Sequence, residues 1–261
     1  VFDADNVLDV NYFREMNKTF DNGAKASTSY RNSKNYDSNW ISAGYAVWFL
    51  REAKFLSQAR LTLNTSCAVS GTGFYVSADI IEKNDGWKWH LLTEDIEFSA
   101  NSILEGIQIS YTPTAILYDE QPVTFRDSWN QRFRWAKGFY QVFFTYVGHL
   151  FKSMAKFHRF AAYDLFVTIA PGMLLTLISF LANGTFLIVG SLSNGFLATR
   201  AEMDMCMGSL VFTLASAYLT FFFMGITTTI SERRHIHCPQ RWRIVTNLFT
   251  FPLFMFTYIP L

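Results

Sequence analysis

Hydrophobic and polar positions divide the chain into two parts of different character. Over residues 1–127, short apolar runs alternate with polar stretches of helical periodicity, a pattern typical of an α/β domain. The first ten residues, which open on Val1-Phe2, are expected to be the end of a buried strand, so we expect an N-terminally truncated chain. The pattern predicts helices over residues 10–22, 40–65, 77–83 and 96–105, and strands over residues 24–31, 74–76, 107–111 and 115–118, the last two separated by Pro113.

The second part has the pattern of a protein at and within a membrane. Residues 128–163 mix aromatic and basic side chains with helical periodicity, which suits amphipathic helices lying in the plane of a membrane surface. Residues 164–261 are predicted to form a transmembrane region. Its expected spans are residues 165–189, 209–230 and 244–261, the last either cut short or bent because it contains two prolines.

The distribution of charge between the predicted spans sets the expected orientation. Residues 231–243 contain four arginines, whereas residues 191–208 contain one arginine against one glutamate and one aspartate. Because cytoplasmic loops are enriched in basic residues, the first of these loops is expected in the cytoplasm. The sequence therefore predicts a multi-pass plasma-membrane protein whose α/β half is cytoplasmic.

Composition agrees with that division and narrows the class of protein. Half of the 261 residues are hydrophobic and only 16% are charged, which is too apolar for an ordinary soluble protein. The formal net charge of +1 gives no reason to expect a nucleic-acid partner. The three cysteines, at positions 67, 206 and 238, are far apart, and we interpret them as reduced thiols.

Asp3-Ala4-Asp5 is the first candidate for chemistry. In an extended strand, residues two apart project to the same side, so the two carboxylates can share one target. Mg²⁺ or Mn²⁺ accepts one or two carboxylates together with the oxygens of a substrate diphosphate. The alternative is an ordinary turn after a strand, since aspartate is common in turns and Asn6 extends the turn-like run.

Thr93-Glu94-Asp95 precedes the predicted helix at residues 96–105. One interpretation is a helix N-terminus, with Thr93 as the cap and acidic residues in the first turn. The other is that one of these carboxylates accepts the proton of an attacking sugar hydroxyl as a general base. The sequence of this segment alone favours the cap.

Gln131, Arg134 and Trp135 have the spacing i, i+3, i+4 and therefore share one helical face. The guanidinium of Arg134 suits diphosphate oxygens, the indole ring offers a flat surface for a sugar, and Gln131 could hold an acceptor hydroxyl. The alternative is a tryptophan of the membrane interface beside a snorkelling arginine.

Taken in order, these three motifs ahead of membrane spans resemble the processive family 2 glycosyltransferases, which include cellulose, hyaluronan, chitin and poly-N-acetylglucosamine synthases. The turn containing Gly71 and Gly73 looks like the acceptor-side loop of that family. The resemblance implies the C-terminal part of a GT-A-type nucleotide-diphospho-sugar transferase domain, whose nucleotide-recognising upstream half is absent from this sequence. Residues 231–243 lack the FxVTxK pattern of bacterial cellulose synthase, which favours poly-N-acetylglucosamine or another exopolysaccharide as the product.

By this resemblance, the chain is a metal-dependent, inverting glycosyltransferase that uses Mg²⁺ or Mn²⁺. It would transfer a sugar from UDP-N-acetylglucosamine or UDP-glucose to a growing β-linked polysaccharide. Accessory membrane subunits would be possible partners. A transferase of one sugar to a lipid acceptor and a non-catalytic membrane scaffold are the alternatives. The implied roles are metal and diphosphate binding by Asp3 and Asp5, catalysis by Asp95 with Glu94 beside it, and substrate binding by Gly71, Gly73, Gln131, Arg134 and Trp135.

Several further residues are given structural interpretations. His235, His237 and Cys238 could bind a soft metal, but their arginine-rich segment is better explained by anionic lipid headgroups or by packing under the catalytic domain. Asp164 is expected to be an interfacial residue. Trp87 and Trp89 are expected to pack in the core rather than to stack on sugar.

Overall fold

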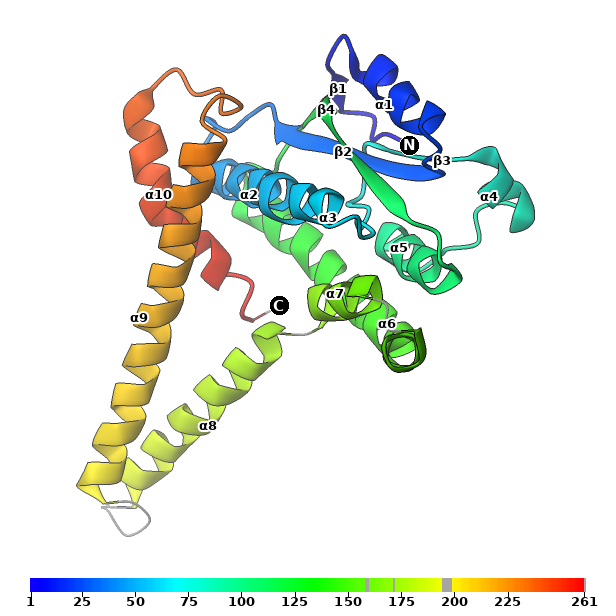
Figure 1. The fold of residues 1–261 in the computed structure, drawn as a ribbon. Helices are drawn as coiled ribbons and strands as arrows, with labels where there is room; N and C mark the ends of the chain where they lie inside the picture. Colours follow the sequence, from blue (N-terminus) through cyan, green and yellow to red (C-terminus); the bar gives the residue numbers. More distant parts are fainter. Residues whose placement is uncertain (158–159, 171, 194–198, 261) are drawn as a thin grey trace.

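The computed structural model describes residues 1–157, 160–170, 172–193 and 199–260 (Figure 1). A four-stranded sheet with flanking helices forms one end of the molecule, and long helices extend from it. Along the chain the elements are β1 (Val7–Leu8), α1 (Tyr12–Asp21), β2 (Ala26–Ser33), α2 (Trp40–Arg51), the π-helical η1 (Glu52–Ser57), α3 (Gln58–Thr62), β3 (Phe74–Val76), α4 (Ala78–Lys83), α5 (Glu94–Glu105), β4 (Ile109–Asp119), α6 (Phe125–Phe157), α7 (Phe160–Ile169), α8 (Gly172–Leu192), α9 (Arg200–Ser231) and α10 (Arg241–Phe256).

The sheet has the order β1-β4-β2-β3, with β2 and β4 parallel at its centre and the two outer strands antiparallel to their neighbours. The predicted α/β class of the first half is confirmed. The predicted helices at residues 10–22, 77–83 and 96–105 correspond to α1, α4 and α5, and the strand at residues 74–76 to β3. The helix expected over residues 40–65 is present as α2, η1 and α3 in succession.

Two strand predictions are wrong. From the predicted segments 107–111 and 115–118, residues 109–111 and 115–118 belong to one strand, β4, whose register on β2 shifts between Ser29, which pairs with Thr112, and Tyr30, which pairs with Ile116. Such an irregularity accommodates Pro113, which has no N–H to give the ladder, without ending the strand. At the start of the chain, only Val7–Leu8 is a strand, and Val1 is 61% exposed rather than buried.

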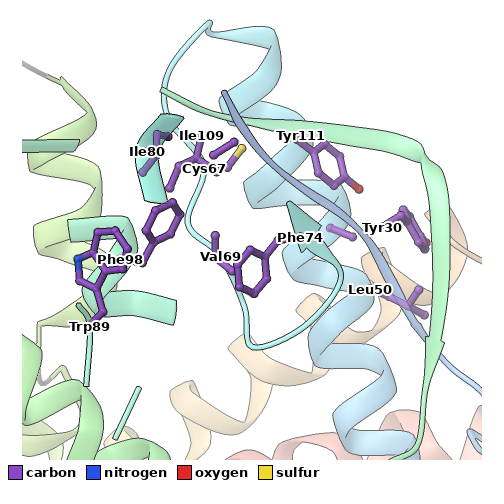
Figure 2. Packing of buried hydrophobic residues seen from close by; sticks show 12 residues of the cluster. Tyr30, Leu50, Cys67, Val69, Phe74, Ile80, Trp89, Phe98, Ile109 and Tyr111 are labelled. Carbon is purple, nitrogen blue, oxygen red and sulfur yellow. The ribbon is translucent and has the colours of Figure 1, made fainter. Parts of the chain in front are cut away.

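Packing of the sheet against the helices buries a mainly aromatic and aliphatic cluster, part of which is shown in Figure 2. Trp89 is 2% exposed and its ring lies edge-on to Phe98, with ring centroids 4.8 Å apart. Trp87 packs against the same cluster and stacks on Phe98. The core interpretation of both tryptophans is therefore confirmed.

The predicted span at residues 165–189 is not a single helix. α7 ends at Ile169, a bend follows at residue 170, and α8 begins at Gly172. Residue 170 precedes a proline in the sequence, and that position disfavours the helical conformation. α7 is instead tied to the α/β domain, because Arg60 of α3 donates to the Asp164 carboxylate at 2.6 Å and to the Thr168 hydroxyl at 2.9 Å.

α9 contains the predicted span at residues 209–230 and is, within the described part of the chain, the one helix long and apolar enough to cross a membrane. Together with α8 it forms a hairpin that projects away from the sheet (Figure 1). The segment expected as a span at residues 244–261 contains α10, which has 16 residues and includes Pro252. α10 buries Phe251 and Phe254 against α2 and α9.

Candidate active site

The first carboxylate motif forms a tight turn beside the C-terminal end of β4. The Asn6 N–H donates to the Asp3 carbonyl at 3.2 Å, so the turn, and not the alternation of a strand, brings Asp3 and Asp5 together. This differs from the strand geometry expected from the sequence. Carboxylate oxygens of Asp3, Asp5 and Asp119 all lie within 4.8 Å of one another.

Asp119 is a member of this site that the sequence reasoning missed. It is the last residue of β4 and is 3% exposed. Its carboxylate accepts hydrogen bonds from both the Nε and a terminal nitrogen of Arg31, and from the side-chain amides of Gln121 at 2.9 Å and Asn6 at 3.0 Å. An aspartate directly after an apolar strand was available as a signal, since the same reasoning had been applied to the first motif.

The donor set suits a hard divalent cation. Asp3 and Asp5 are exposed and offer carboxylate oxygens, which Mg²⁺ and Mn²⁺ prefer. Partial desolvation and the charge of Asp119 raise the pKa of Asp3, so a cation between these groups would relieve their repulsion. Among the described residues no other group of three or more histidine, cysteine or acidic side chains is arranged to hold a metal, and His235, His237 and Cys238 do not form one.

A glycine-containing loop, residues 70–73, joins the carboxylate turn to the second motif. The Asp3 N–H donates to the Thr72 hydroxyl at 3.1 Å, and that hydroxyl donates to the side-chain carbonyl of Asn6. On the other side of the loop, the Gly71 N–H donates to an Asp95 carboxylate oxygen at 2.6 Å. The loop therefore fixes the separation between the proposed metal ligands and Asp95.

Both glycines of the loop adopt left-handed conformations, with φ of +74° at Gly71 and +69° at Gly73. A β-carbon added at Gly73 would lie 1.8 Å from Leu117 Cδ2 and 2.5 Å from the Ser29 hydroxyl. Glycine is required there by both the backbone conformation and the close approach of β2 and β4.

Asp95 occupies the first turn of α5 and is half-buried. Burial raises its pKa to about 6, although the N–H groups of Ile96 and Gly71 favour the ionised form. Glu94 is exposed beside it, and the charge of Glu94 also raises the pKa of Asp3. A carboxylate with a pKa near 6 is ionised at neutral pH and still basic enough to accept a proton.

The helix-cap interpretation of the second motif is only partly confirmed. Thr93 occupies the N-cap position of α5, and acidic residues fill the first turn as expected. Its hydroxyl, however, makes no capping hydrogen bond and is buried without a hydrogen-bond partner in the described part of the protein. Thr93 is pressed instead against Gly138 of α6.

The third motif lies near the start of α6, on the face that meets the second motif. Gln131, Arg134, Gly138 and Gln141 recur at intervals of three or four residues and share that face. The Gln141 side-chain oxygen accepts from the Leu92 N–H at 3.3 Å, next to the contact between Gly138 and Thr93. Leu92 and Thr93 therefore meet α6 at Gln141 and Gly138, about two turns and one turn beyond Arg134.

The individual side chains of this motif differ in exposure. Arg134 is exposed, and Trp135 is half-buried with its ring edge-on to Tyr45 of α2 at a centroid distance of 5.9 Å. The side-chain oxygen of Gln131 is buried and has no hydrogen-bond partner among the described residues. The Arg134 guanidinium is thus open to a ligand, the Gln131 oxygen is buried and unpaired among the described residues, and Trp135 serves the packing of α6 on α2.

Comparison with known proteins agrees with this arrangement. Residues 1–257 match the family described as glycosyl transferase family group 2. A Bacillus subtilis (strain 168) protein named "Probable glycosyltransferase YdaM" is 35% identical over 104 residues, which are 38% of this chain and 25% of that protein. The poly-beta-1,6-N-acetyl-D-glucosamine synthase of Staphylococcus aureus (strain COL) is 37% identical over 79 residues, 30% of this chain and 18% of the synthase.

The matched segments thus span a quarter or less of these relatives, whereas the family match covers nearly the whole of this chain. The resemblance to family 2 synthases is confirmed at the level of the family. The chain belongs to glycosyl transferase family group 2.

Proposed function

We propose that the protein transfers a sugar from a UDP-sugar to a growing β-linked polysaccharide, with inversion at the anomeric carbon. One observation carries the proposal: Asp95, whose pKa is raised to about 6, is joined through the loop at residues 70–73 to the carboxylate turn of Asp3 and Asp5. A base and a diphosphate site held by one loop suit a direct displacement at the carbon between them.

In the proposed reaction, an acceptor hydroxyl oxygen forms a bond to the anomeric carbon on the face opposite the diphosphate. The bond from that carbon to the diphosphate oxygen breaks with its electron pair, UDP leaves, and the hydroxyl proton passes to Asp95. An α-linked donor then gives a β-linked product. Asp95 would be the only base required. The negative charge of Glu94 would help to keep the pKa of Asp95 raised.

Mg²⁺ or Mn²⁺, held by Asp3 and Asp5, would supply charge neutralisation of the leaving diphosphate when bound. Asp119 has its carboxylate engaged by Arg31 and Asn6, so we assign it to orienting the turn. Asp119, through its bond from Asn6, would then keep the exposed carboxylates of Asp3 and Asp5 in place.

The remaining substrate contacts are proposed for the glycine loop and for α6. Gly71 presents its N–H toward Asp95, and Gly73 lets the loop close on the sheet. On α6, Arg134 would bind the diphosphate and the unpartnered oxygen of Gln131 would accept from an acceptor hydroxyl, its lack of a partner referring to the described residues. The exposed part of the Trp135 ring would carry the acceptor sugar.

The product and donor are proposed from the relatives. The staphylococcal relative is named for synthesis of poly-beta-1,6-N-acetyl-D-glucosamine, which supports UDP-N-acetylglucosamine as donor ahead of UDP-glucose. Transfer of one sugar to a lipid acceptor is the second candidate.

A multi-pass, plasma-membrane location is proposed with the catalytic residues 1–127 in the cytoplasm and residues 128–163 at the membrane surface. The 32-residue α9 supports a membrane crossing, and exposed apolar side chains on α8, such as Leu181 and Ile188, support a return through α8. α10 is assigned to the cytoplasmic surface because it packs on α2. Accessory membrane subunits remain part of the proposal.

The test is sugar transfer by membranes that contain the full-length protein, with radiolabelled UDP-N-acetylglucosamine or UDP-glucose and either Mn²⁺ or EDTA. Gel separation distinguishes long polymer, the expected product, from a lipid carrying one sugar. Asp5→Asn should abolish incorporation, whereas Asp21→Asn, an exposed aspartate at the end of α1, should not. Full activity of Asp5→Asn, or polymer formation in EDTA, would contradict metal dependence.

A further inference from the structure

Gly138 is the point of closest approach between α6 and the second carboxylate motif. A β-carbon built on Gly138 would lie 2.5 Å from Thr93 Cγ2, 2.7 Å from Thr93 Oγ1 and 2.9 Å from the Thr93 backbone nitrogen. All three separations are shorter than a β-carbon tolerates, so something must move if Gly138 gains a side chain.

Thr93 has little room to move away. It is 4% exposed, and Glu97, one turn further along α5, donates its N–H to the Thr93 carbonyl at 3.0 Å. Rotation of the Thr93 side chain cannot clear both Cγ2 and Oγ1 from the added β-carbon, and it leaves the contact to the backbone nitrogen unchanged. A side chain at Gly138 therefore displaces α6 or α5 itself.

The displacement would act directly on the site. Asp95 lies two residues after Thr93, and Arg134 lies one helical turn before Gly138, about 6 Å along the axis of α6. Gly138 thus lies at the contact between α6, which carries the proposed diphosphate ligand, and the start of α5, which carries the proposed base.

Other glycines in helices are also crowded, but elsewhere. A β-carbon on Gly44 would lie 2.4 Å from Phe254 Cγ, where α2 meets α10. On α6 itself, Gly148 provides a contrast, because a β-carbon there has no described heavy atom within 4 Å. Glycine in a helix interior costs about 1 kcal/mol relative to alanine, and along α6 close packing accounts for glycine at position 138 but not at position 148.

We propose that Gly138 is a positioning residue for sugar transfer, which sets the separation between Arg134 on α6 and Asp95 on α5. This inference rests on the proposed function, since it assigns these two side chains to one reaction. Gly138 itself touches neither substrate nor metal in this assignment. Its role is to let α6 approach the backbone of Thr93.

The experiment compares Gly138→Ala with Gly148→Ala in the full-length protein in membranes. Both changes are identical in chemistry and lie on one helix, but only the first creates a steric conflict. Gly138→Ala should lower kcat by about 100-fold, the cost of a displacement of about 1 Å between reacting groups. Gly148→Ala should keep wild-type kcat, and the KM for the UDP-sugar should change far less than kcat in Gly138→Ala.

A second variant tests the contact that is responsible. Thr93→Ala combined with Gly138→Ala removes the two side-chain conflicts and leaves only the contact to the backbone nitrogen. The double variant should recover about tenfold of the lost kcat, because the remaining displacement is smaller. Equal kcat in the single Gly138→Ala variant and the double variant would overturn the assignment to Thr93.

Hydrogen exchange of the backbone gives a readout that does not depend on activity. The Leu92 N–H is bonded to Gln141 of α6, so Gly138→Ala should speed its exchange and Gly148→Ala should not. If wild-type membranes transfer no sugar, the proposed function fails while the exchange data still test the contact. Wild-type kcat in Gly138→Ala, or an equal loss in both alanine variants, would overturn the positioning role.

Discussion

Replacement of Asp95 by asparagine separates the chemistry of this residue from its place in the fold. Asparagine keeps the shape and can still accept from the Gly71 N–H, but it cannot take a proton. A positioned general base contributes about 10²–10⁴-fold to the rate, so the variant should lose activity by that amount. It should remain folded in the membrane.

The same substitution should stabilise the protein at neutral pH. Burial raises the pKa of Asp95 from 3.8 to about 6, so the unfolded chain releases this proton at lower pH than the native protein does. As the pH rises from about 4 to about 6, the native state loses up to about 3 kcal/mol relative to the unfolded state. Asp95→Asn removes that loss, and its melting temperature in detergent should exceed that of the wild type at pH 7 but not at pH 4.

The pH dependence of the activity is a kinetic test of Asp95 as the general base. Because the base must be ionised, kcat/KM of the wild type should fall about tenfold per pH unit below about 6, measured at saturating Mn²⁺ so that protonation of Asp3 does not limit metal binding. Asp85→Asn, an exposed control, should retain the wild-type profile. A flat profile between pH 5 and 7, or wild-type turnover in Asp95→Asn, would refute the assignment of the base.

Three further substitutions test the supports of the site. Asp119→Ala should destabilise the protein by about 3–5 kcal/mol, because Arg31, whose side chain is 13% exposed, loses its carboxylate partner; denaturant unfolding measures this, and a loss below 1 kcal/mol would contradict it. Gly73→Ala should cost about 2–5 kcal/mol from its left-handed backbone and its steric conflict, seen as a lower melting temperature and refuted by an unchanged one. Arg60→Ala should loosen α7 through loss of the ion pair to Asp164, costing about 1–3 kcal/mol; limited proteolysis should then cut near α7, and wild-type resistance would contradict this.

The elements of the α/β half were predictable where the local pattern agrees with the tertiary structure. Helical or alternating patterns with polar boundaries mark α1, α4, α5 and β3. The bounds of these elements in the structure are close to the predicted ones. β4 was misjudged because Pro113 normally interrupts a ladder, while a register shift against Ser29 and Tyr30 absorbs it here. That compensation depends on the neighbouring strand, more than 80 residues away in sequence.

Hydropathy predicted the helices of the second half less well. It measures the length of an apolar segment and does not show which other elements pack against that segment. α10 is apolar over much of its 16 residues, and its Phe254 packs on Gly44 of α2. A β-carbon on Gly44 would collide with the Phe254 ring. The packing of α10 on α2 thus depends on a glycine about 200 positions earlier in the sequence. The division of the apolar stretch at residue 170, by contrast, had a local signal in the following proline.

The candidate site was predictable as a set of motifs but not as a connected structure. The sequence identified Asp3, Asp5 and Asp95 by residue type and spacing, but Asn6 was interpreted only as an extension of a turn. In the structure, Asn6 is the link, since its amide donates to Asp119 and its carbonyl accepts from Thr72. Sequence separations of 113 and 66 residues make these bonds invisible to any local pattern.

These links bring the two carboxylate motifs close enough for their charges to interact. Asp119 and Glu94 both raise the pKa of Asp3, and Glu94 also raises that of Asp95, so the two motifs share one field of negative charge. Arg31 offsets part of that charge, and its side chain also donates to the Ser70 carbonyl at the start of the glycine loop. A divalent cation at the carboxylate turn would add positive charge to the same field. Binding of the cation at the carboxylate turn and ionisation of Asp95 should therefore favour each other.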